Sequence, residues 1–479
     1  MRVILGPVFF IIVKFKIKSI LLQGLIFVVL FWIMIANLMG KIDYYRQHWF
    51  VKNVATLQVG SFGGTIVQAV IGIVIARLLQ PELLGIYSLA FGLAATTSLI
   101  IGMGIQEAVS SLLGRAYAQK DGTETENILG FMFKITFFAA LIVLVFSAFL
   151  PSISEKLYGN SLIGIYASII VVAVVLSSFF FTLAYSAFQV TGRIKSLTYL
   201  IVTDQSLRTG LSLVLVIAGF GVLGAVSGHL IGALIIFISS ALLFRGLRTG
   251  DSIFPDLRRL ITSAKNVSLK KYFGFTFWVA LDRNMGNLFM ALPVILTGIY
   301  VTASEVSFFR LAFGYVNLAL SLLGPISVLL NVEFPKLQIE NKEKLAENFK
   351  KVSLYSLGLS VILTVGAVIV SPFAFKILYG ENFLPSVPYV AGLIVYGALY
   401  GIGVGLGPMW RAINRVKVSI IINLIILGIG IPTGLWLIKS YGLWGSVIMV
   451  TSWFIVSHFT SFFYLLKNLK SKHSSILIS

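Results

Sequence analysis

Apolar residues gather in about twelve stretches of roughly 20 residues each, and short polar segments separate one stretch from the next. A helix of about 20 apolar residues is long enough to cross the hydrocarbon core of a bilayer. Each stretch therefore predicts one membrane-spanning helix. The predicted helices are 55–76, 83–107, 129–150, 162–188, 197–218, 221–244, 272–298, 303–330, 353–371, 388–408, 418–438 and 442–465. No segment between them is both large and polar, so the pattern predicts an all-α polytopic membrane protein with about twelve core transmembrane helices.

Four short motifs occur twice, in the same order and with a spacing of 221 or 222 residues. The pairs are Leu89–Gly92 with Leu311–Gly314, Leu157–Gly159 with Leu378–Gly380, Arg193–Lys195 with Arg415–Lys417, and Gly221–Gly224 with Gly442–Gly445. A duplicated helical bundle is a usual construction for transporters. The repeat predicts two six-helix lobes related as parallel repeats. The N-lobe would be 41–244 and the C-lobe 272–466, with a basic linker at 245–271 and a tail at 467–479.

The net charge of +20 raises the question of a nucleic-acid partner, but the distribution of the basic residues argues against one. Of the 37 Lys and Arg, 25 fall in segments that the alternating helices would place on one side of the membrane. Only Arg77, Lys156, Lys376 and Lys439 fall in the opposite loops. This asymmetry follows the positive-inside rule. It predicts a multi-pass protein of the cell (plasma) membrane with both ends of the core in the cytoplasm, and no nucleic-acid partner is expected.

The first 40 residues do not fit the twelve-helix pattern. Residues 19–39 are apolar enough to span a membrane, but basic residues flank them on both sides, so the charge rule gives no orientation. Residues 1–40 are therefore either an extra N-terminal helix or a mis-assigned start, with translation beginning at Met39. Residues 41–54 combine aromatic and charged residues, which is typical of an interfacial amphipathic lead-in.

The loop after the first predicted helix, Ala76–Ala90, reads ARLLQPELLGIYSLA and resembles the corresponding loop of polysaccharide flippases. These are the Wzx-type O-antigen and repeat-unit transporters of the multidrug/oligosaccharidyl-lipid/polysaccharide (MOP) superfamily. Gly298–Phe309, Leu378–Phe383 and Tyr441–Gly445 are similar to later loops of that family, although Ser307 stands where a glycine is common. The resemblance covers about 40–465 of the chain.

This resemblance implies a two-lobed transporter that works by alternating access. Its cargo would be a polyprenyl-(pyro)phosphate-linked oligosaccharide, moved from the inner to the outer leaflet for surface polysaccharide biosynthesis. The expected partners are this lipid-linked oligosaccharide, the membrane lipids and a coupling ion, either a proton or sodium, and we expect a monomer. The alternatives are a lipid II flippase or a multidrug or cation antiporter of the same superfamily, and less favourably a membrane glycosyltransferase or ligase.

An enzyme is disfavoured because the chain lacks the residue patterns that membrane catalysis needs. There is no HExxH motif, no P-loop and no cluster of metal ligands. The absence of cysteine excludes thiol catalysis and cysteine-based metal sites. We therefore expect no cofactor and no metal. A cationic drug as cargo would favour an acidic cavity, whereas this chain places arginines in its predicted helices.

Several charged or amide side chains lie in the predicted helices at positions where the other half of the repeat is uncharged. An ionisable residue at the bilayer centre costs about 3 kcal/mol on insertion scales, so each such residue needs a reason. The residues are Asp204, Arg208, Asp282, Arg283, Asn284, Asn287 and Arg310, and their counterparts are Ile425–Ile426, Ile429–Gly430, Gly60, Ser61, Phe62, Thr65 and Ser88. The duplicate half packs without these charges, so packing alone does not explain them. We predict that they bind substrate.

Structural explanations compete with this prediction at three places. Asp204 and Arg208 are four residues apart, so they share a helical face and can neutralise one another instead of lining a cavity. Arg283 either contacts substrate or forms an interhelical ion pair, and its neighbour Asp282 diverges from it by about 100° around the helix. Arg310 lies early in its helix and either binds substrate or extends to the membrane surface.

The chemistry of the implied cargo suits these side chains. A guanidinium forms charge-assisted, bidentate hydrogen bonds with phosphate oxygens and stays protonated at low dielectric. A carboxylate such as Asp282 could release the arginine between cycles or carry a coupling proton. Neutral donors and acceptors for sugar hydroxyls are Asn284, Asn287, Asn317 and Gln106. The sequence thus predicts a water-accessible cavity between the lobes that holds Arg283, with Asp282 or Arg208 nearby.

Overall fold

The computed structural model describes residues 49–101, 103–250 and 253–471, and within these ranges the regular elements are all helices. The predicted extra N-terminal helix at 1–40, most of the lead-in at 41–54 and the end of the tail lie outside the described residues. Within the described residues, eight helices are long and apolar enough to cross a membrane, or up to nine if the bent pair Glu381–Gly392 and Ile394–Ala412 is one span. The chain is therefore an all-α, multi-pass membrane protein.

The first half of the chain contains the elements from α2 to α9. They are α2 (Trp49–Thr97), η1 (Ser98–Ile101), α3 (Met103–Ala118), α4 (Gly122–Ser147), α5 (Leu150–Tyr158), α6 (Ser161–Val190), α7 (Ile194–Leu215), η2 (Val216–Phe220), α8 (Gly221–Gly250) and α9 (Leu257–Asn266). The long helix α2 consists of two helices joined at Gln80, whose backbone is left-handed with φ 61°. The stretch from α7 to α8 reverses at Gly219 and Gly221, with φ of 93° and 53°, and the two helices pack side by side. Each of these two long stretches therefore contains more than one pass.

The second half contains the helices from α10 onward. They are α10 (Leu269–Thr297), α11 (Ala303–Leu320), η3 (Ser321–Leu323), α12 (Gly324–Glu340), α13 (Lys342–Ala374), η4 (Phe375–Tyr379), η5 (Glu381–Ser386), α14 (Val387–Gly392), α15 (Ile394–Gly403), α16 (Leu406–Ala412), α17 (Val416–Tyr441) and α18 (Leu443–Ser471). The predicted helix 388–408 is broken into α14, α15 and the start of α16. Helix α10 has a membrane-spanning length but is less apolar than the eight, because Asp282, Arg283, Asn284 and Asn287 lie at its centre.

Several connections are much shorter than hydropathy predicted. The predicted loop at 108–128 is helical up to Ala118, and the predicted connector at 331–352 is helical except at Asn341. The side chains of Asp121 and Asn341 accept hydrogen bonds from the backbone N–H groups of Glu124 and Lys344, and so cap α4 and α13. Hydropathy detects only the part of a helix that lies in hydrocarbon. Hydropathy therefore does not reveal the part of a helix that extends beyond the membrane and begins at a polar N-cap residue.

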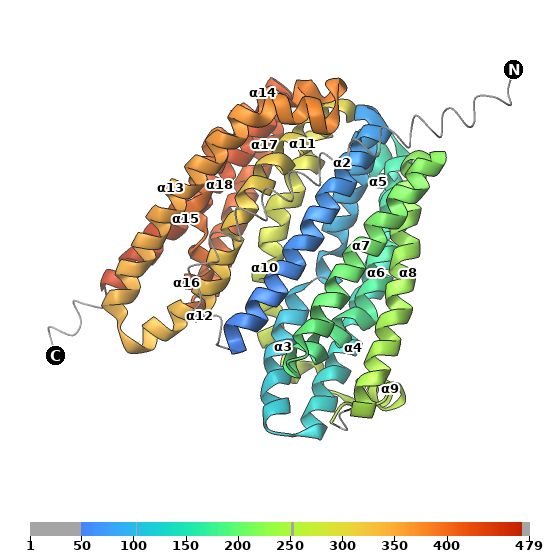
Figure 1. The fold of residues 1–479 in the computed structure, drawn as a ribbon, viewed down its shortest axis with the longest axis vertical. Coiled ribbons are helices and arrows are strands. Elements are labelled where there is room, and N and C mark those ends of the chain that lie inside the picture. The colour runs from blue at the N-terminus through green and yellow to red at the C-terminus, as the bar shows by residue number, and fades with distance from the viewer. Residues whose placement is uncertain (1–48, 102, 251–252, 472–479) are drawn as a thin grey trace, which may run out of the picture.

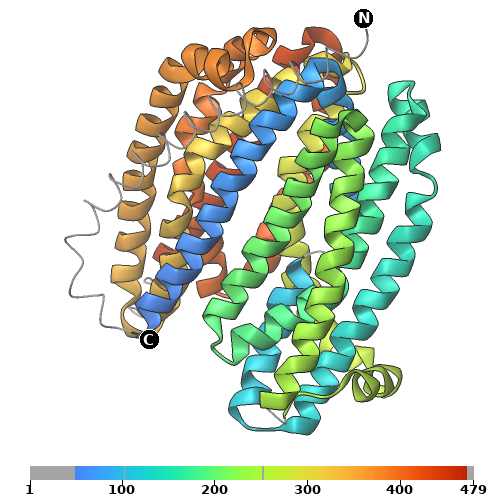
Figure 2. The same cartoon turned by 45° about the vertical axis from the view of Figure 1, so that its right-hand side comes forward.

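The helices form two groups that meet along α2, α10 and α11 (Figures 1 and 2). In Figure 1, the helices of the first half (blue to green) lie on one side and those of the second half (yellow to red) on the other, with α14 near the top and α9 near the bottom. We call these two ends of the bundle the α14 end and the α9 end, and the two groups the N-lobe and the C-lobe.

The apolar core is shared by the lobes at one end and divided at the other. One buried cluster contains residues of both lobes, among them Leu89 and Ala90 of α2 and Phe309 and Phe313 of α11. A second cluster lies almost entirely in the N-lobe and packs α3, α4, α6 and α9 together. A third cluster lies entirely in the C-lobe, around Phe334 and Phe349. The lobes are therefore joined toward the α14 end and have separate cores toward the α9 end.

Candidate functional site

The two lobes contact each other closely at the α14 end. A Cβ atom added to Gly85 on α2 would lie 1.7 Å from the carbonyl oxygen of Ala303 on α11, so only glycine allows this approach. The amide of Asn382 donates a hydrogen bond of 2.6 Å to Gln80 Oε1. The guanidinium of Arg77 also donates to the carbonyl oxygen of Ile377 in η4. We call the contacts Arg77–Ile377, Gln80–Asn382 and Gly85–Ala303 the lobe latch.

Arg310 of α11 lies across the lobe boundary from α2. Its guanidinium carbon is 5.6 Å from the ring centroid of Tyr87 and 5.7 Å from that of Phe91, which is cation–π distance. The Nη1 atom of Arg310 is buried and has no hydrogen-bond partner among the described residues. Within the same part of the chain, no carboxylate forms an ion pair with this guanidinium. The guanidinium of Arg310 in the C-lobe thus packs against aromatic rings of the N-lobe, and its Nη1 atom remains available as a hydrogen-bond donor.

A second arginine lies close to this boundary on the N-lobe side. His229 of α8 shares a hydrogen bond of 2.9 Å with the hydroxyl of Tyr87, and the centroid of its ring is 5.8 Å from that of Phe91. Arg208 of α7 packs against α8 at Gly232, where an added Cβ would lie 2.9 Å from Arg208 Cγ. One nitrogen of Arg208 pairs with Asp204, which is only 6% exposed.

We call the group Tyr87, Phe91, Asp204, Arg208, His229 and Arg310 the interlobe arginine cluster. It contains two guanidinium groups and one carboxylate, so it carries one net positive charge when His229 is neutral. A buried charge without a partner is costly, and a bound anion would remove that cost. The arrangement is therefore suited to an anion that comes between the lobes.

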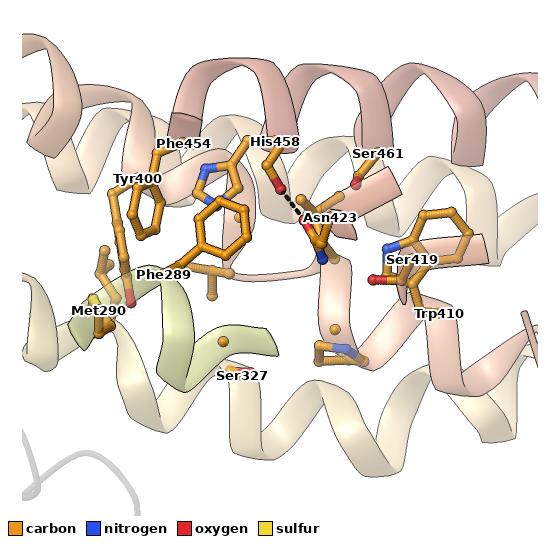
Figure 3. Close-up of a pocket in the computed structure, with 18 of the residues that line it drawn as sticks. Phe289, Met290, Ser327, Tyr400, Trp410, Ser419, Asn423, Phe454, His458 and Ser461 are labelled. Atoms are coloured by element: carbon orange, nitrogen blue, oxygen red, sulfur yellow. Dashed lines mark hydrogen bonds between the residues drawn. The ribbon is translucent and has the colours of Figure 1, made fainter. Parts of the chain in front are cut away.

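The C-lobe contains a cavity of about 340 Å³ between α10, α12 and α15 to α18 (Figure 3). Its lining contains no Asp, Glu, Lys or Arg. The polar groups that line it are Ser327, Tyr400, Ser419, Asn423, Ser457, His458 and Ser461, and the larger apolar ones are Phe289, Met290, Trp410 and Phe454. This volume is at the lower end of the roughly 300–1,000 Å³ found for small-molecule sites.

Arg283 lies beside this cavity but is not among the residues that line it. It is exposed, and it precedes the lining residues Gly286 and Met290 by three and seven positions on α10. Residues at this spacing share one face of a helix. Arg283 therefore points to the same side of α10 as the cavity, one turn nearer the α9 end.

The other predicted residues of α10 have separate contacts. Asp282 Oδ2 is 3.8 Å from Arg411 Nη1 on α16, and Arg411 also donates to Asn331 Oδ1 over 2.8 Å. Asn284 donates to the carbonyl oxygen of Leu99 in the N-lobe over 2.9 Å, and Asn287 is exposed. Asp282 thus contacts the C-lobe, Arg283 lies on the side of the cavity, and Asn284 contacts the N-lobe.

The two remaining amides do not lie at these sites. Asn317 accepts a hydrogen bond of 2.6 Å from Tyr396 and donates to the carbonyl oxygen of Phe313 over 2.8 Å, so it stabilises the C-lobe core. Gln106 of α3 is buried. Neither side chain lines the cavity.

The sequence did not identify Arg411 as a candidate. It lies in segment 409–417 between two predicted helices, where the positive-inside rule alone explains a basic residue. Its contact with Asp282 joins residues that are far apart in the chain. The structure also extends α16 up to Ala412, which places Arg411 in the last turn of that helix, next to cavity-lining Gly407. No local pattern in the sequence contains this information.

The sequence matches a family described as "Polysaccharide biosynthesis protein" over residues 74–388. Among curated proteins, none matches the chain. The fold is similar to an inward-facing multidrug resistance MATE family transporter of the MOP superfamily, with a TM-score of 0.67, 15% identity, and coverage of 84% of this chain and 96% of that one. An outward-facing MATE family transporter gives 0.57 at 16% identity, covering 88% and 96%. The lipid II flippase MurJ in an inward closed conformation gives 0.63 at 16% identity, covering 86% and 87%.

Proposed function

Because the chain belongs to the polysaccharide biosynthesis protein family, as its loop motifs predicted, we propose that it flips a polyprenyl-(pyro)phosphate-linked oligosaccharide from the inner to the outer leaflet. At a coarser level, the chain is a multi-pass membrane protein of a transporter superfamily. Arg310 is the single observation that carries the choice of cargo. Its buried guanidinium lies between the lobes, has an unsatisfied donor and has no carboxylate partner among the described residues.

An anionic headgroup is the ligand that this site favours. A phosphate placed between Arg310 and Arg208 would receive charge-assisted hydrogen bonds where water is excluded. The planar guanidinium also matches the geometry of two phosphate oxygens, which an ammonium does not. A positive interlobe cluster disfavours a cationic drug as cargo, because burying two like charges together costs free energy. A lipid II flippase would use the same phosphate chemistry and is distinguished by its sugar and peptide.

Alternating access fits the division of the apolar core. We place the α9 end of the bundle in the cytoplasm, because most Lys and Arg lie in the segments that connect helices at that end. The lobes have separate cores there, whereas the lobe latch closes the α14 end. In this conformation a headgroup would come from the cytoplasmic leaflet past Arg283 and reach Arg310. Opening the latch would then release it outward, and proton or sodium coupling stays a prediction.

The test is flipping by the purified chain in liposomes. The probe is a fluorescent polyprenyl-pyrophosphate-linked oligosaccharide, and its movement is followed by loss of access to a reagent in one compartment. We expect Arg310→Gln to reduce flipping to the rate of protein-free liposomes. Arg310→Lys keeps the charge but loses the planar fork, and we expect it to lower the rate by about tenfold. The matched control is Arg115→Gln, because Arg115 is exposed in the last turn of α3.

Normal flipping by a folded Arg310→Gln protein would remove this residue from the mechanism. Flipping of a cationic dye instead of the pyrophosphate lipid would favour the antiporter alternative. Thermal unfolding of each variant in detergent, compared with that of the unsubstituted chain, separates loss of function from loss of the fold.

A further inference from the structure

The C-lobe cavity has a lining chemically different from the interlobe arginine cluster. Six helices contribute to it, namely α10, α12, α15, α16, α17 and α18. It is lined by uncharged groups only, with hydroxyl and amide groups beside aromatic rings. A site of this composition favours a ligand that is neutral, rich in hydrogen-bonding groups and apolar on at least one face.

Three of the four serine hydroxyls that line the cavity are not used by the protein itself. Elsewhere in the bundle, many serine hydroxyls donate to backbone carbonyl groups, as Ser371 does to Val368 over 2.8 Å, whereas Ser98, Ser240, Ser353 and Ser386 are buried and have no partner among the described residues. In the part of the chain that the structure describes, the hydroxyls of Ser327, Ser419 and Ser461 form no hydrogen bond, although all three line the cavity. A polar side chain at membrane depth without a partner is unfavourable. These three positions therefore indicate a ligand or water on the cavity side.

An amide and a phenol add two further donors. Asn423 Oδ1 accepts a hydrogen bond of 2.8 Å from Ser457, and its amide nitrogen lies on the side away from this bond (Figure 3). The hydroxyl of Tyr400 is directed toward Met290 and forms no hydrogen bond with a described residue (Figure 3). Oriented donors of this kind fix the position of a ligand that has several acceptors.

The aromatic rings supply the apolar wall. Phe289 and Phe454 pack edge to face with ring centroids 5.7 Å apart, and His458 lies 5.5 Å from Phe454. The face of an aromatic ring is negative and attracts C–H groups, which one face of a pyranose ring presents. The same pyranose carries hydroxyls around its edge, where the serine, tyrosine and asparagine groups would meet them.

The position of the cavity relative to Arg310 is also suitable. Met290 lies seven residues before the end of α10, and Arg310 lies seven residues after the start of α11. At 1.5 Å per residue, both are about 10 Å from the α14 end of their helices. The rest of the cavity extends from Met290 toward the α9 end, at Ser419 and Trp410. A headgroup with its phosphate at Arg310 would thus have its sugar on the cytoplasmic side.

From this chemistry, and resting on the proposed function, we infer that the C-lobe cavity binds an uncharged sugar ring of the lipid-linked oligosaccharide. The proposal divides substrate recognition between the lobes. The interlobe arginine cluster would bind the phosphate of any polyprenyl carrier. The C-lobe cavity would distinguish a glycosylated carrier from a bare one.

The test measures binding rather than flipping. The purified full chain in nanodiscs is titrated with radiolabelled polyprenyl pyrophosphate and with the same lipid carrying one N-acetylhexosamine. We expect the unsubstituted chain to bind the glycosylated lipid about tenfold more tightly, as one or two net hydrogen bonds provide. Asn423→Leu and Tyr400→Phe should reduce this ratio by roughly threefold to tenfold and leave the affinity for the bare lipid unchanged. Tyr199→Phe is the matched control, because Tyr199 is 73% exposed on α7.

The outcomes separate this inference from the proposed function. Equal affinity for the two lipids in the unsubstituted chain, or an unchanged ratio in both cavity variants with normal thermal unfolding, overturns the inference. A cavity variant that changes only the sodium dependence of binding assigns the cavity to a cation and also overturns it. By contrast, Arg310→Gln should weaken both lipids and keep their ratio. If that variant flips the lipid normally while the ratio still depends on Asn423, the proposed role of Arg310 fails and the sugar site stands.

Discussion

Gln80 and Asn382 are 302 residues apart in the chain, and a hydrogen bond of 2.6 Å joins their side chains. Gln80 lies at the break of α2, where the backbone is left-handed, and Asn382 lies in η5. The bond connects the N-lobe to the C-lobe at the α14 end, beside the contact of Gly85 with Ala303. If the protein works by alternating access, this bond must break in each cycle, because both residues would separate when the α14 end opens.

Linking these two positions should stop transport. The chain has no cysteine, so a Gln80→Cys/Asn382→Cys protein has only the introduced thiols. A short bifunctional methanethiosulfonate reagent should join them in the conformation described above. Because a locked end leaves only one state accessible, flipping should fall to the protein-free rate and recover after reduction. Liposome flipping before and after dithiothreitol measures this effect.

Each single-cysteine protein treated with the same reagent is the control for modification without linkage. A cross-linked protein that still flips lipid at the normal rate would show that the lobes do not part at the lobe latch. The opening would then have to lie elsewhere on the lobe boundary.

Gly85 should control how often the latch closes. A Cβ at this position would lie 1.7 Å from the carbonyl oxygen of Ala303, so Gly85→Val forces the two helices apart. Overpacking costs about 1–3 kcal/mol, or a factor of roughly 5 to 150 in the ratio of closed to open protein. The yield of the Gln80→Cys/Asn382→Cys cross-link should fall accordingly. Gly72→Val is the matched control, since nothing lies within 4 Å of a Cβ at Gly72.

Much of the architecture could be predicted from local sequence patterns. Apolar length identified the membrane helices, and the four-residue spacing of Asp204 and Arg208 predicted the ion pair that the structure contains. These features depend on neighbours within one helix, so a single sequence is sufficient to predict them. The loop motifs predicted a polysaccharide transport family, and the match to the polysaccharide biosynthesis protein family confirms that family.

The parts that could not be predicted depend on polar caps or on distant contacts. The predicted connector 331–352 is helical except at Asn341, which caps α13. Hydropathy did not predict these helical residues, because a polar helix outside the bilayer has no hydropathy signal. The contact of Arg310 with Tyr87 crosses the lobe boundary, and the pair of Asp282 with Arg411 joins α10 to α16. A sequence shows that these residues are polar but not which of them meet. The prediction centred the site on Arg283, whereas the structure gives Arg310 the more buried position.

The Asp204–Arg208 pair should be required for stability as a unit. Asp204 is 6% exposed, so removing Arg208 leaves a buried carboxylate without its cation. Breaking a buried ion pair from one side costs about 3–5 kcal/mol, whereas replacing both partners by apolar residues is often close to neutral. We expect Arg208→Met to lower the unfolding temperature clearly, and Asp204→Leu/Arg208→Met to recover most of the loss. Thermal unfolding in detergent measures both, and a double variant less stable than either single one would contradict the prediction.

Arg283 should affect how the lipid is first bound rather than how fast it crosses. It is exposed and lies one helical turn from Gly286, on the face of α10 that lines the cavity, so a headgroup coming from the α9 end would meet it before Arg310. A contact made only on first binding changes the half-saturating lipid concentration and leaves the maximal rate unaltered, by the same logic that separates KM from kcat. We expect Arg283→Gln to raise the half-saturating concentration by about tenfold, as the loss of one charge-assisted hydrogen bond does.

Initial flipping rates over a range of lipid concentrations distinguish Arg283 from Arg310. Arg283→Lys should retain most of the binding, because an exposed contact at the mouth needs charge more than a planar fork. Lys270→Gln is the control, since Lys270 is exposed in the first turn of the same helix. Arg310→Gln should lower the maximal rate as well as weaken binding, because its guanidinium is buried where the lobes meet. If Arg283→Gln lowers the maximal rate at an unchanged half-saturating concentration, then Arg283 acts together with Arg310 in the crossing step, and the order of contacts argued above is wrong.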